Sequence, residues 1–141
     1  MLFSCLLSQA QVNWLSFEQL DSALNANPKP VFIEFYTDWC TYCKKMEQEV
    51  FTYREVVNEL NSSFYAVRFD AENEDTITFE GIEYVKDQNA SFHQLAIALA
   101  SQNGQFTPPA LIFLDEDFKV KTRVFSYQSK KNLLIKLRKH H

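Results

Sequence analysis

Three segments of the chain are mainly apolar and only five or six residues long, and they lie at 31–36, 64–69 and 110–114. Runs of this length and composition are typical of strands that are covered on both faces of a sheet. The segment 118–125 alternates between apolar and polar residues instead, which predicts an edge strand in a hairpin with the strand before it. The pattern therefore predicts a central sheet of about four strands.

Between these strands the apolar residues recur every three or four positions, which is the spacing of a helix that buries one face. A first helix is expected to begin at the capping box Ser16–Gln19 and to stop before Pro28 and Pro30. A second pattern runs from Thr41 to Leu60 and predicts one helix of about five turns.

Two more helices are expected in the second half of the chain. Ser91 to Gln94 has the form of another capping box, so that His93 would lie at the surface in the first turn of the following helix. Ser129 would cap a final helix near the end of the sequence.

Residues 70–88 form a small acidic insertion after the second strand, with seven carboxylates against one lysine. Strand-like runs on either side of Glu80-Gly81 predict a short hairpin within it. We expect these charges to form a solvated surface, and a docking surface for a basic partner is the alternative.

The order of the elements predicts an α/β fold with a mixed central sheet flanked by helices. Strands separated by helices run parallel through crossovers, whereas the last two strands pair antiparallel. In such sheets the carboxyl ends of the strands hold the functional site. The strand at 31–36 ends shortly before Cys40, so we expect the site there.

Composition narrows the possible functions. The 141 residues are 46% hydrophobic and 15% aromatic, which is enough for a single domain with a sizeable core. The formal net charge of −4 argues against nucleic acid and anionic membrane surfaces as partners. No apolar run reaches the ~20 residues of a membrane span.

Residues 1–10 resemble the end of a signal peptide, so that residues 11–141 would form the domain. A short apolar stretch there precedes Ser8 and Ala10, which fit a cleavage site with small residues. The same stretch loosely resembles a lipobox with Cys5 as the anchored residue, and a buried N-terminal strand is a third interpretation. We expect export, most simply to the periplasm, in preference to a lipid anchor or a cytoplasmic location.

Two cysteines, Cys40 and Cys43, are separated by two residues where the first strand gives way to a helix. The unpaired N–H groups and the positive dipole end at a helix start favour a thiolate at Cys40. A thiolate is the nucleophile in thiol–disulfide exchange. The helical pattern places Cys43 on the buried face and leaves Cys40 at an exposed tip.

Two other interpretations of this cysteine pair are weaker. A structural zinc needs about four ligands, and the remaining candidates, Cys5, His93, His140 and His141, form no second paired motif. A purely structural disulfide is not required in a chain with so apolar a core. We therefore predict a redox-active disulfide that works without a metal or another cofactor.

These features resemble the thioredoxin superfamily over residues 16–139. The resemblance is carried by Trp39-Cys40-x-x-Cys43-Lys44, by the carboxylate of Glu34 six residues before the first cysteine, and by a proline before the third core strand. The continuation from Cys43 to Glu47 is similar to an exported subgroup, which includes the thioredoxin-like domain of thiol:disulfide interchange proteins.

The resemblance implies that Cys40 attacks the substrate and that Cys43 resolves the mixed disulfide. Glu34 takes the place of the family's buried carboxylate. Burial raises a carboxyl pKa, which would let Glu34 accept a proton from Cys43 near neutral pH, and a purely structural carboxylate is the alternative. Pro109 matches the family's cis-proline, with Pro108 as the second candidate.

The resemblance also places Trp39, Thr41, Tyr42, Pro108 and Pro109 in contact with the substrate. Two positions differ from the common family pattern. Thr41-Tyr42 replaces the frequent Gly-Pro, which leaves the reduction potential open. Pro108 has no N–H, so it offers a substrate strand only its carbonyl if Pro109 is the cis residue.

The predicted function is a monomeric thiol:disulfide oxidoreductase that reduces protein disulfides outside the cytoplasm. Its partners would be protein disulfide substrates and an electron donor protein. The alternatives are a disulfide-forming or isomerising enzyme, and a binding module of the same fold whose cysteine pair is vestigial.

Overall fold

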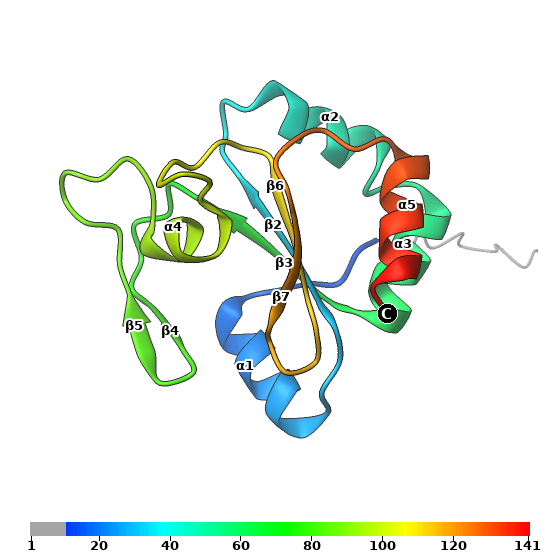
Figure 1. Cartoon of the computed structure of the whole chain (residues 1–141), viewed down its shortest axis with the longest axis horizontal. Helices are drawn as coiled ribbons and strands as arrows, with labels where there is room; N and C mark the ends of the chain where they lie inside the picture. Colours follow the sequence, from blue (N-terminus) through cyan, green and yellow to red (C-terminus); the bar gives the residue numbers. More distant parts are fainter. Residues whose placement is uncertain (1–10) are drawn as a thin grey trace, which may run out of the picture.

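A five-stranded sheet forms the centre of the computed structural model, which describes residues 11–141 (Figure 1). Its spatial order is β1-β3-β2-β6-β7. The β1–β3 and β2–β3 pairs are parallel, and the β2–β6 and β6–β7 pairs are antiparallel. The strands are β1 (Trp14–Leu15), β2 (Val31–Tyr36), β3 (Tyr65–Asp70), β6 (Ala110–Leu114) and β7 (Val120–Val124).

This arrangement confirms the predicted α/β fold with a mixed sheet. The sheet has one strand more than predicted. The additional strand, β1, is only two residues long, which is too short for a strand pattern to be visible in the sequence. The expectations for residues 1–10, Cys5 among them, lie outside the described residues.

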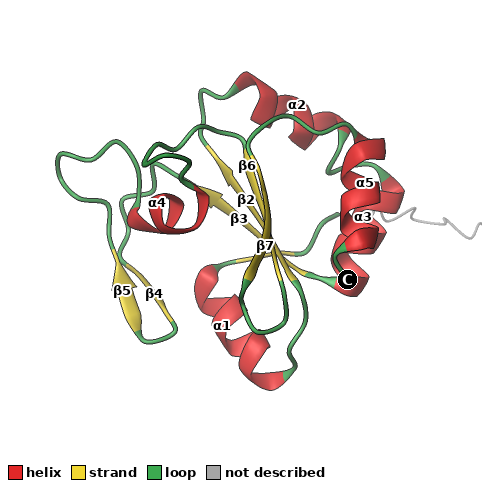
Figure 2. Cartoon of the chain, viewed as in Figure 1, coloured by secondary structure: helices red, strands yellow, loops and turns green. Residues whose placement is uncertain are grey.

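Helices cover both faces of the sheet (Figure 2). The helices α1 (Phe17–Ala26) and α4 (Gln94–Ala100) pack on one face, and α2 (Thr41–Glu49), α3 (Arg54–Ser63) and α5 (Lys130–Lys139) pack on the other. The predicted caps of α1 and α5 are confirmed, since Ser16 and Ser129 each accept a backbone hydrogen bond in the first turn. Among residues 11–141 no helix is both long and apolar enough to cross a bilayer.

The helix predicted from 41 to 60 is wrong in one respect, because the structure divides it into α2 and α3. At the break, the N–H of Phe51 donates to the carbonyl of Met46 over 2.9 Å, and the chain leaves its α-helical course. This turn directs the ring of Phe51 into the core, edge-on to Trp14 with 5.2 Å between the ring centroids. Burial of an aromatic ring offsets the helical hydrogen bonds that are lost.

The acidic insertion contains the predicted hairpin, formed by β4 (Ile77–Phe79) and β5 (Ile82–Tyr84). Phe79 is buried and packs edge-on to Phe17 of α1, with 5.4 Å between the ring centroids. The insertion therefore extends the core on the face that α1 covers, while most of its carboxylates lie at the surface.

His93 is fully buried, so its predicted surface position is wrong. The predicted cap at Ser91 is also wrong, because His93 itself is the N-cap of α4. Its Nδ1 accepts from the N–H of Leu95 at 3.2 Å, and its Nε2 lies 2.9 Å from the carbonyl of Asp75. A ring nitrogen that accepts leaves the other to donate, so this side chain replaces the expected serine cap and ties the insertion to α4.

Candidate active site

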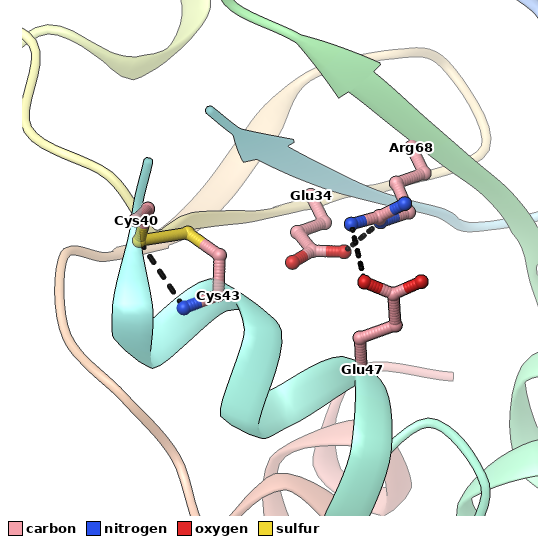
Figure 3. A network of polar contacts seen from close by, with 5 residues as sticks. All are labelled: Glu34, Cys40, Cys43, Glu47 and Arg68. Carbon is pink, nitrogen blue, oxygen red and sulfur yellow. Dashed lines mark hydrogen bonds and ion pairs between the residues drawn. A yellow bond between two sulfur atoms is a disulfide. The ribbon is translucent and has the colours of Figure 1, made fainter. Parts of the chain in front are cut away.

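A disulfide joins Cys40 and Cys43 where the chain leaves the carboxyl end of β2 and enters α2. Cys40 is the N-cap of α2, and its Sγ accepts from the N–H of Cys43 at 3.1 Å (Figure 3). Cys40 is 5% exposed and Cys43 1%. Cys40 is therefore more exposed than Cys43, as predicted. The prediction that Cys40 lies at an exposed tip is wrong, because its sulfur caps the helix and folds back over the first turn.

Two aromatic side chains next to the disulfide are open to solvent. Trp39 is 61% exposed and Tyr42 is 60% exposed. The indole N–H of Trp39 donates to a carboxylate oxygen of Glu72 at 2.8 Å, and the ring of Tyr42 lies 6.1 Å from that of Tyr127. Thr41, between the cysteines, is exposed as well. Large exposed rings grouped at one place are typical of interaction surfaces.

Two consecutive prolines lead into β6 at the same edge of the sheet. The peptide bond between Pro108 and Pro109 is cis, and Pro109 is buried whereas Pro108 is partly exposed. Ala110, the next residue, pairs with Phe35 of β2. This register brings the two prolines to the carboxyl end of β2, where the cysteine loop begins.

Glu34 lies in the middle of β2 and its side chain has no exposed surface. Its Oε2 accepts from Nε of Arg68, which is its register partner on β3, at 3.0 Å. Nη2 of the same guanidinium lies 3.3 Å from Oε2 of Glu47 on α2 (Figure 3). The guanidinium also stacks over the ring of Tyr36 at 3.7 Å. A chain of three charged groups therefore runs from the sheet to the outer part of α2.

The second oxygen of Glu34, Oε1, is buried and has no hydrogen-bond partner among the described residues. Figure 3 shows it on the side of the carboxyl group that faces the disulfide. An unpaired acceptor in this position is costly when it is charged. It is also free to exchange a proton with a neighbouring group.

Burial raises the pKa of Glu34 from 4.5 to about 7, because a charge in this apolar setting is poorly solvated. The charge and the hydrogen bond of Arg68 lower the pKa and so oppose part of this effect, while the charge of Glu47 raises it slightly. Glu34 can therefore gain and lose a proton near neutral pH, as a general acid or base requires.

Cys40, Cys43 and Pro109 lie near the carboxyl end of β2, and Glu34 lies deeper in that strand with its unpaired oxygen toward the disulfide (Figure 3). Arg68 was not predicted as part of this site. The sequence does contain a signal for it. Glu34 is the only charged residue of β2, and Arg68 is the only charged residue of β3 before Asp70, with which that strand ends. Their pairing needs the register between these strands, which the sequence pattern does not specify. Among the described residues no group of three or more His, Cys, Asp or Glu side chains could hold a metal ion.

The fold and the disulfide site place the chain in a class of known proteins. A family model described as a thioredoxin-like domain matches residues 17–141. The chain therefore belongs to the thioredoxin-like domain family.

Curated relatives of this chain include proteins named thiol:disulfide interchange protein DsbD. The protein from Campylobacter jejuni is 25% identical over 122 residues, which are 86% of this chain and 18% of the relative. The protein from Ralstonia nicotianae is 30% identical over 128 residues, which are 88% of this chain and 18% of the relative. The chain thus spans about a fifth of the length of the curated relatives that it matches.

Solved structures share the fold. The C-terminal domain of DsbD from Neisseria meningitidis in its reduced form has a TM-score of 0.58 at 20% identity, over 86% of this chain and 90% of that domain. A structure named DsbH oxidoreductase has a TM-score of 0.64 at 20% identity, over 93% of this chain and 85% of that one.

The raised pKa of Glu34 predicts a specific dependence of stability on pH. This carboxyl titrates near 4.5 in its ordinary state and near 7 in the folded protein, so the folded state binds the extra proton between these values. The stabilising contribution is fully present below about pH 4.5 and is lost as the pH rises through about 7. We expect the free energy of unfolding of the oxidised protein to lose on the order of 2–3 kcal/mol from this group between about pH 5 and 8.

Urea unfolding of the oxidised protein at both pH values measures this slope. Glu34→Gln should remove most of it, because an amide does not titrate in this range. Glu55→Gln is the matched control, since its side chain is 53% exposed in an ion pair with Arg138, and it should keep the slope. Equal slopes in the wild type and in Glu34→Gln would contradict the assignment.

Proposed function

We propose that this protein is a thiol:disulfide oxidoreductase that uses Cys40 and Cys43 to reduce disulfides in other proteins. The observation that carries the proposal is the disulfide at the start of α2, backed by a buried carboxyl group whose pKa is about 7. The names of the curated relatives, which are thiol:disulfide interchange proteins, support the same reaction class.

In the first step, reduced Cys40 attacks one sulfur of the substrate disulfide as a thiolate. A bond forms between Cys40 and that sulfur, and the second substrate sulfur leaves as a thiolate. Cys40 suits this role because its sulfur accepts a backbone N–H at the positive end of α2, and this interaction lowers the energy of the thiolate.

In the second step, Glu34 takes the proton from the Cys43 thiol, and the Cys43 sulfur attacks Sγ of Cys40. The bond between Cys40 and the first substrate sulfur breaks, and that sulfur leaves as a thiolate, which can take a proton from the solvent. The substrate has then gained two electrons and the protein holds the Cys40–Cys43 disulfide, so a donor must return the electrons. A base inside the protein is needed because Cys43 is 1% exposed.

Substitution of each cysteine separates these two steps. Cys40→Ser should abolish reduction of a protein disulfide such as those of insulin, because the attacking thiolate is lost. Cys43→Ser should keep the first attack and accumulate a covalent complex with the substrate, visible on a non-reducing gel and lost on addition of dithiothreitol. A covalent complex that forms with Cys40→Ser and not with Cys43→Ser would reverse the assigned roles.

We propose further that Trp39, Thr41, Tyr42 and Pro108 form the surface on which the substrate docks, with the buried Pro109 directly after Pro108 in the chain. The support is their position around the disulfide at the carboxyl end of β2, and the high exposure of the two aromatic rings. Rings of this kind carry much of the binding energy at protein interfaces.

Trp39→Ala and Tyr42→Ala should therefore raise KM for a protein disulfide by about three- to tenfold, which corresponds to about 1 kcal/mol of lost binding. Their effect on a small disulfide such as oxidised glutathione should be much smaller, because a small substrate does not reach both rings. Ile135→Ala is the matched control, since this residue is 59% exposed and lies on α5, outside the cysteine loop. Equal effects of all three substitutions would contradict a docking role.

We propose that the reaction runs toward substrate reduction and takes place outside the cytoplasm. The support for export is the leader-like composition of residues 1–10, with the only other cysteine within that segment. Equilibration of the cysteine pair with glutathione buffers should give a reduction potential closer to about −270 mV, the value of a reductant, than to about −120 mV, the value of an oxidant. An oxidant-like potential would contradict the proposed direction.

Fractionation of cells that make the full chain should recover the protein outside the cytoplasm. Recovery in the cytoplasm would contradict the proposed location.

A further inference from the structure

We propose that the open edge of β3, in a groove between the start of α1 and the insertion, binds an extended basic segment of a partner protein, which adds to the sheet as a further strand. Binding at this edge needs no redox chemistry. The inference therefore goes beyond the proposed function, and it bears on that function only through the position of the groove relative to the disulfide.

One edge of β3 is only partly paired. On the other edge, β2 pairs with the whole strand, Tyr65–Asp70. On this edge, β1 pairs only with Ala66 and Val67, because it ends at Leu15. In the described part of the chain no other strand lies on this side of the sheet. The last three residues of β3, 68–70, therefore have a free edge.

The backbone groups on the free edge follow from the hydrogen bonds on the paired one. The N–H of Ala71, directly after β3, donates to the carbonyl of Tyr36 of β2 at 2.8 Å. The peptide groups of successive residues in a strand point to alternate edges, so the carbonyl of Arg68 and the N–H of Asp70 point away from β2. A donor and an acceptor on an open sheet edge form a template for another strand.

The free edge lies in a groove with a volume of about 670 Å³. The groove is lined by β3 from Val67 to Asp70, by the first residues of α1, and by residues of the insertion between Asn73 and Ile77. Its volume is within the range of ~300–1,000 Å³ that is usual for binding sites. A strand of three residues beside β3 would be about 10 Å long, so the groove can hold a short extended segment.

Both sides of the groove are fixed without a ligand. A capping box holds the first turn of α1. In the insertion, the side chain of Asn73 accepts from the N–H of Asp75 at 2.7 Å, and the carbonyl of Asp75 contacts Nε2 of the buried His93 at 2.9 Å. A site that is already ordered loses little conformational entropy when it binds a partner.

The charges of the groove favour a basic occupant. Its carboxylates belong to Glu18, Asp70 and Asp75, and none of the three forms an ion pair within residues 11–141. The one cationic side chain among the described lining residues is Arg68, which is already paired with two carboxylates outside the lining. Lysine or arginine side chains of an added strand would be attracted here, and acidic ones would be repelled. The occupant that fits is an extended segment with basic side chains.

The groove and the disulfide lie toward the same end of the sheet. Asp70 is the register partner of Tyr36, the last residue of β2, from which the chain runs on to Cys40. Beyond Asp70, the carboxylate of Glu72 accepts the indole N–H of Trp39. A partner held in the groove would therefore have a raised effective concentration near Cys40. This consequence alone rests on the proposed function.

Binding can be measured on the oxidised full chain with two labelled peptides of about eight residues, one alternating lysine with valine and the other alternating glutamate with valine. Fluorescence anisotropy should show about tenfold tighter binding of the lysine peptide. The same lysine peptide with N-methyl groups on its backbone amides should lose about tenfold in affinity, because it keeps its charges but cannot pair with the edge. In NMR spectra the lysine peptide should shift the amide signals of residues 68–70 and protect the N–H of Asp70 from exchange with solvent.

Asp75→Lys should weaken binding of the lysine peptide by about two- to fivefold and strengthen that of the glutamate peptide, because it reverses one charge of the groove. Glu18→Gln on α1 should also weaken binding of the lysine peptide, and it keeps the test decisive if Asp75→Lys disturbs the insertion. Glu116→Lys is the matched control, because it reverses an exposed charge outside the groove and should leave both affinities unchanged.

The inference is overturned if the N-methylated peptide binds as tightly as the unmodified one, or if Glu116→Lys lowers the affinity as much as Asp75→Lys. It is also overturned if the shifted NMR signals belong to Trp39 and Tyr42 and not to residues 68–70. Dimers of the free protein that protect the N–H of Asp70, detected by analytical ultracentrifugation and NMR, would overturn it as well, since the edge would then bind a second copy of this chain.

Cys40→Ser separates the failure of this inference from that of the proposed function. This variant should bind the lysine peptide as the wild type does, although it no longer reduces insulin. If the wild type reduces insulin and does not bind the peptide, the inference about the groove alone is overturned. If the peptide binds and Cys40→Ser reduces insulin as fast as the wild type, the proposed function alone is overturned.

Discussion

The burial of both faces of β2 is the constraint on which the rest of this structure depends. β3 and β6 pair with its two edges, and helices cover the sheet above and below. An apolar strand is suited to this position, and Glu34 is its single charged residue. Replacing a buried ion pair by packed apolar residues is often neutral or stabilising. The presence of a carboxyl group here is therefore better explained by its chemistry than by its contribution to stability.

The same topology explains why the two cysteines experience different surroundings although they lie one helical turn apart. Cys40 is at the tip of α2, where the helix dipole acts most strongly and falls off within a turn. Cys43 is on the buried side of α2 and faces the sheet that carries Glu34 (Figure 3). Dipole stabilisation thus favours a thiolate at the first sulfur. In the proposed reaction the second sulfur would depend on a base within the protein, and this difference would permit the two sulfurs to act in sequence.

Much of the fold could be predicted from the sequence, because strands and helices here have distinct periodicities. The apolar segments predicted the bounds of β2, β3 and β6 to within one residue. Glu34, Cys40 and Cys43 could be grouped from the sequence because they are close together along the chain. The failures have a shared physical cause in tertiary contacts. The helix break at Phe51 depends on the packing of its ring against Trp14, and the burial of His93 depends on its contact with the carbonyl of Asp75 in the insertion. Arg68 belongs to the site only through strand register, which local patterns do not encode.

The insertion after β3 connects the core to the surface around the disulfide. At one end Phe79 packs into the core, and at the other Glu72 accepts the indole N–H of Trp39. His93 joins these parts, since its ring lies 5.1 Å from that of Phe69 and its Nε2 contacts the insertion at Asp75. A single exposed hydrogen bond contributes little to stability, yet it restricts the orientations of a ring that is otherwise free in solvent. The acidic segment is therefore better understood as a support for Trp39 that is anchored in the core than as an independent charged surface.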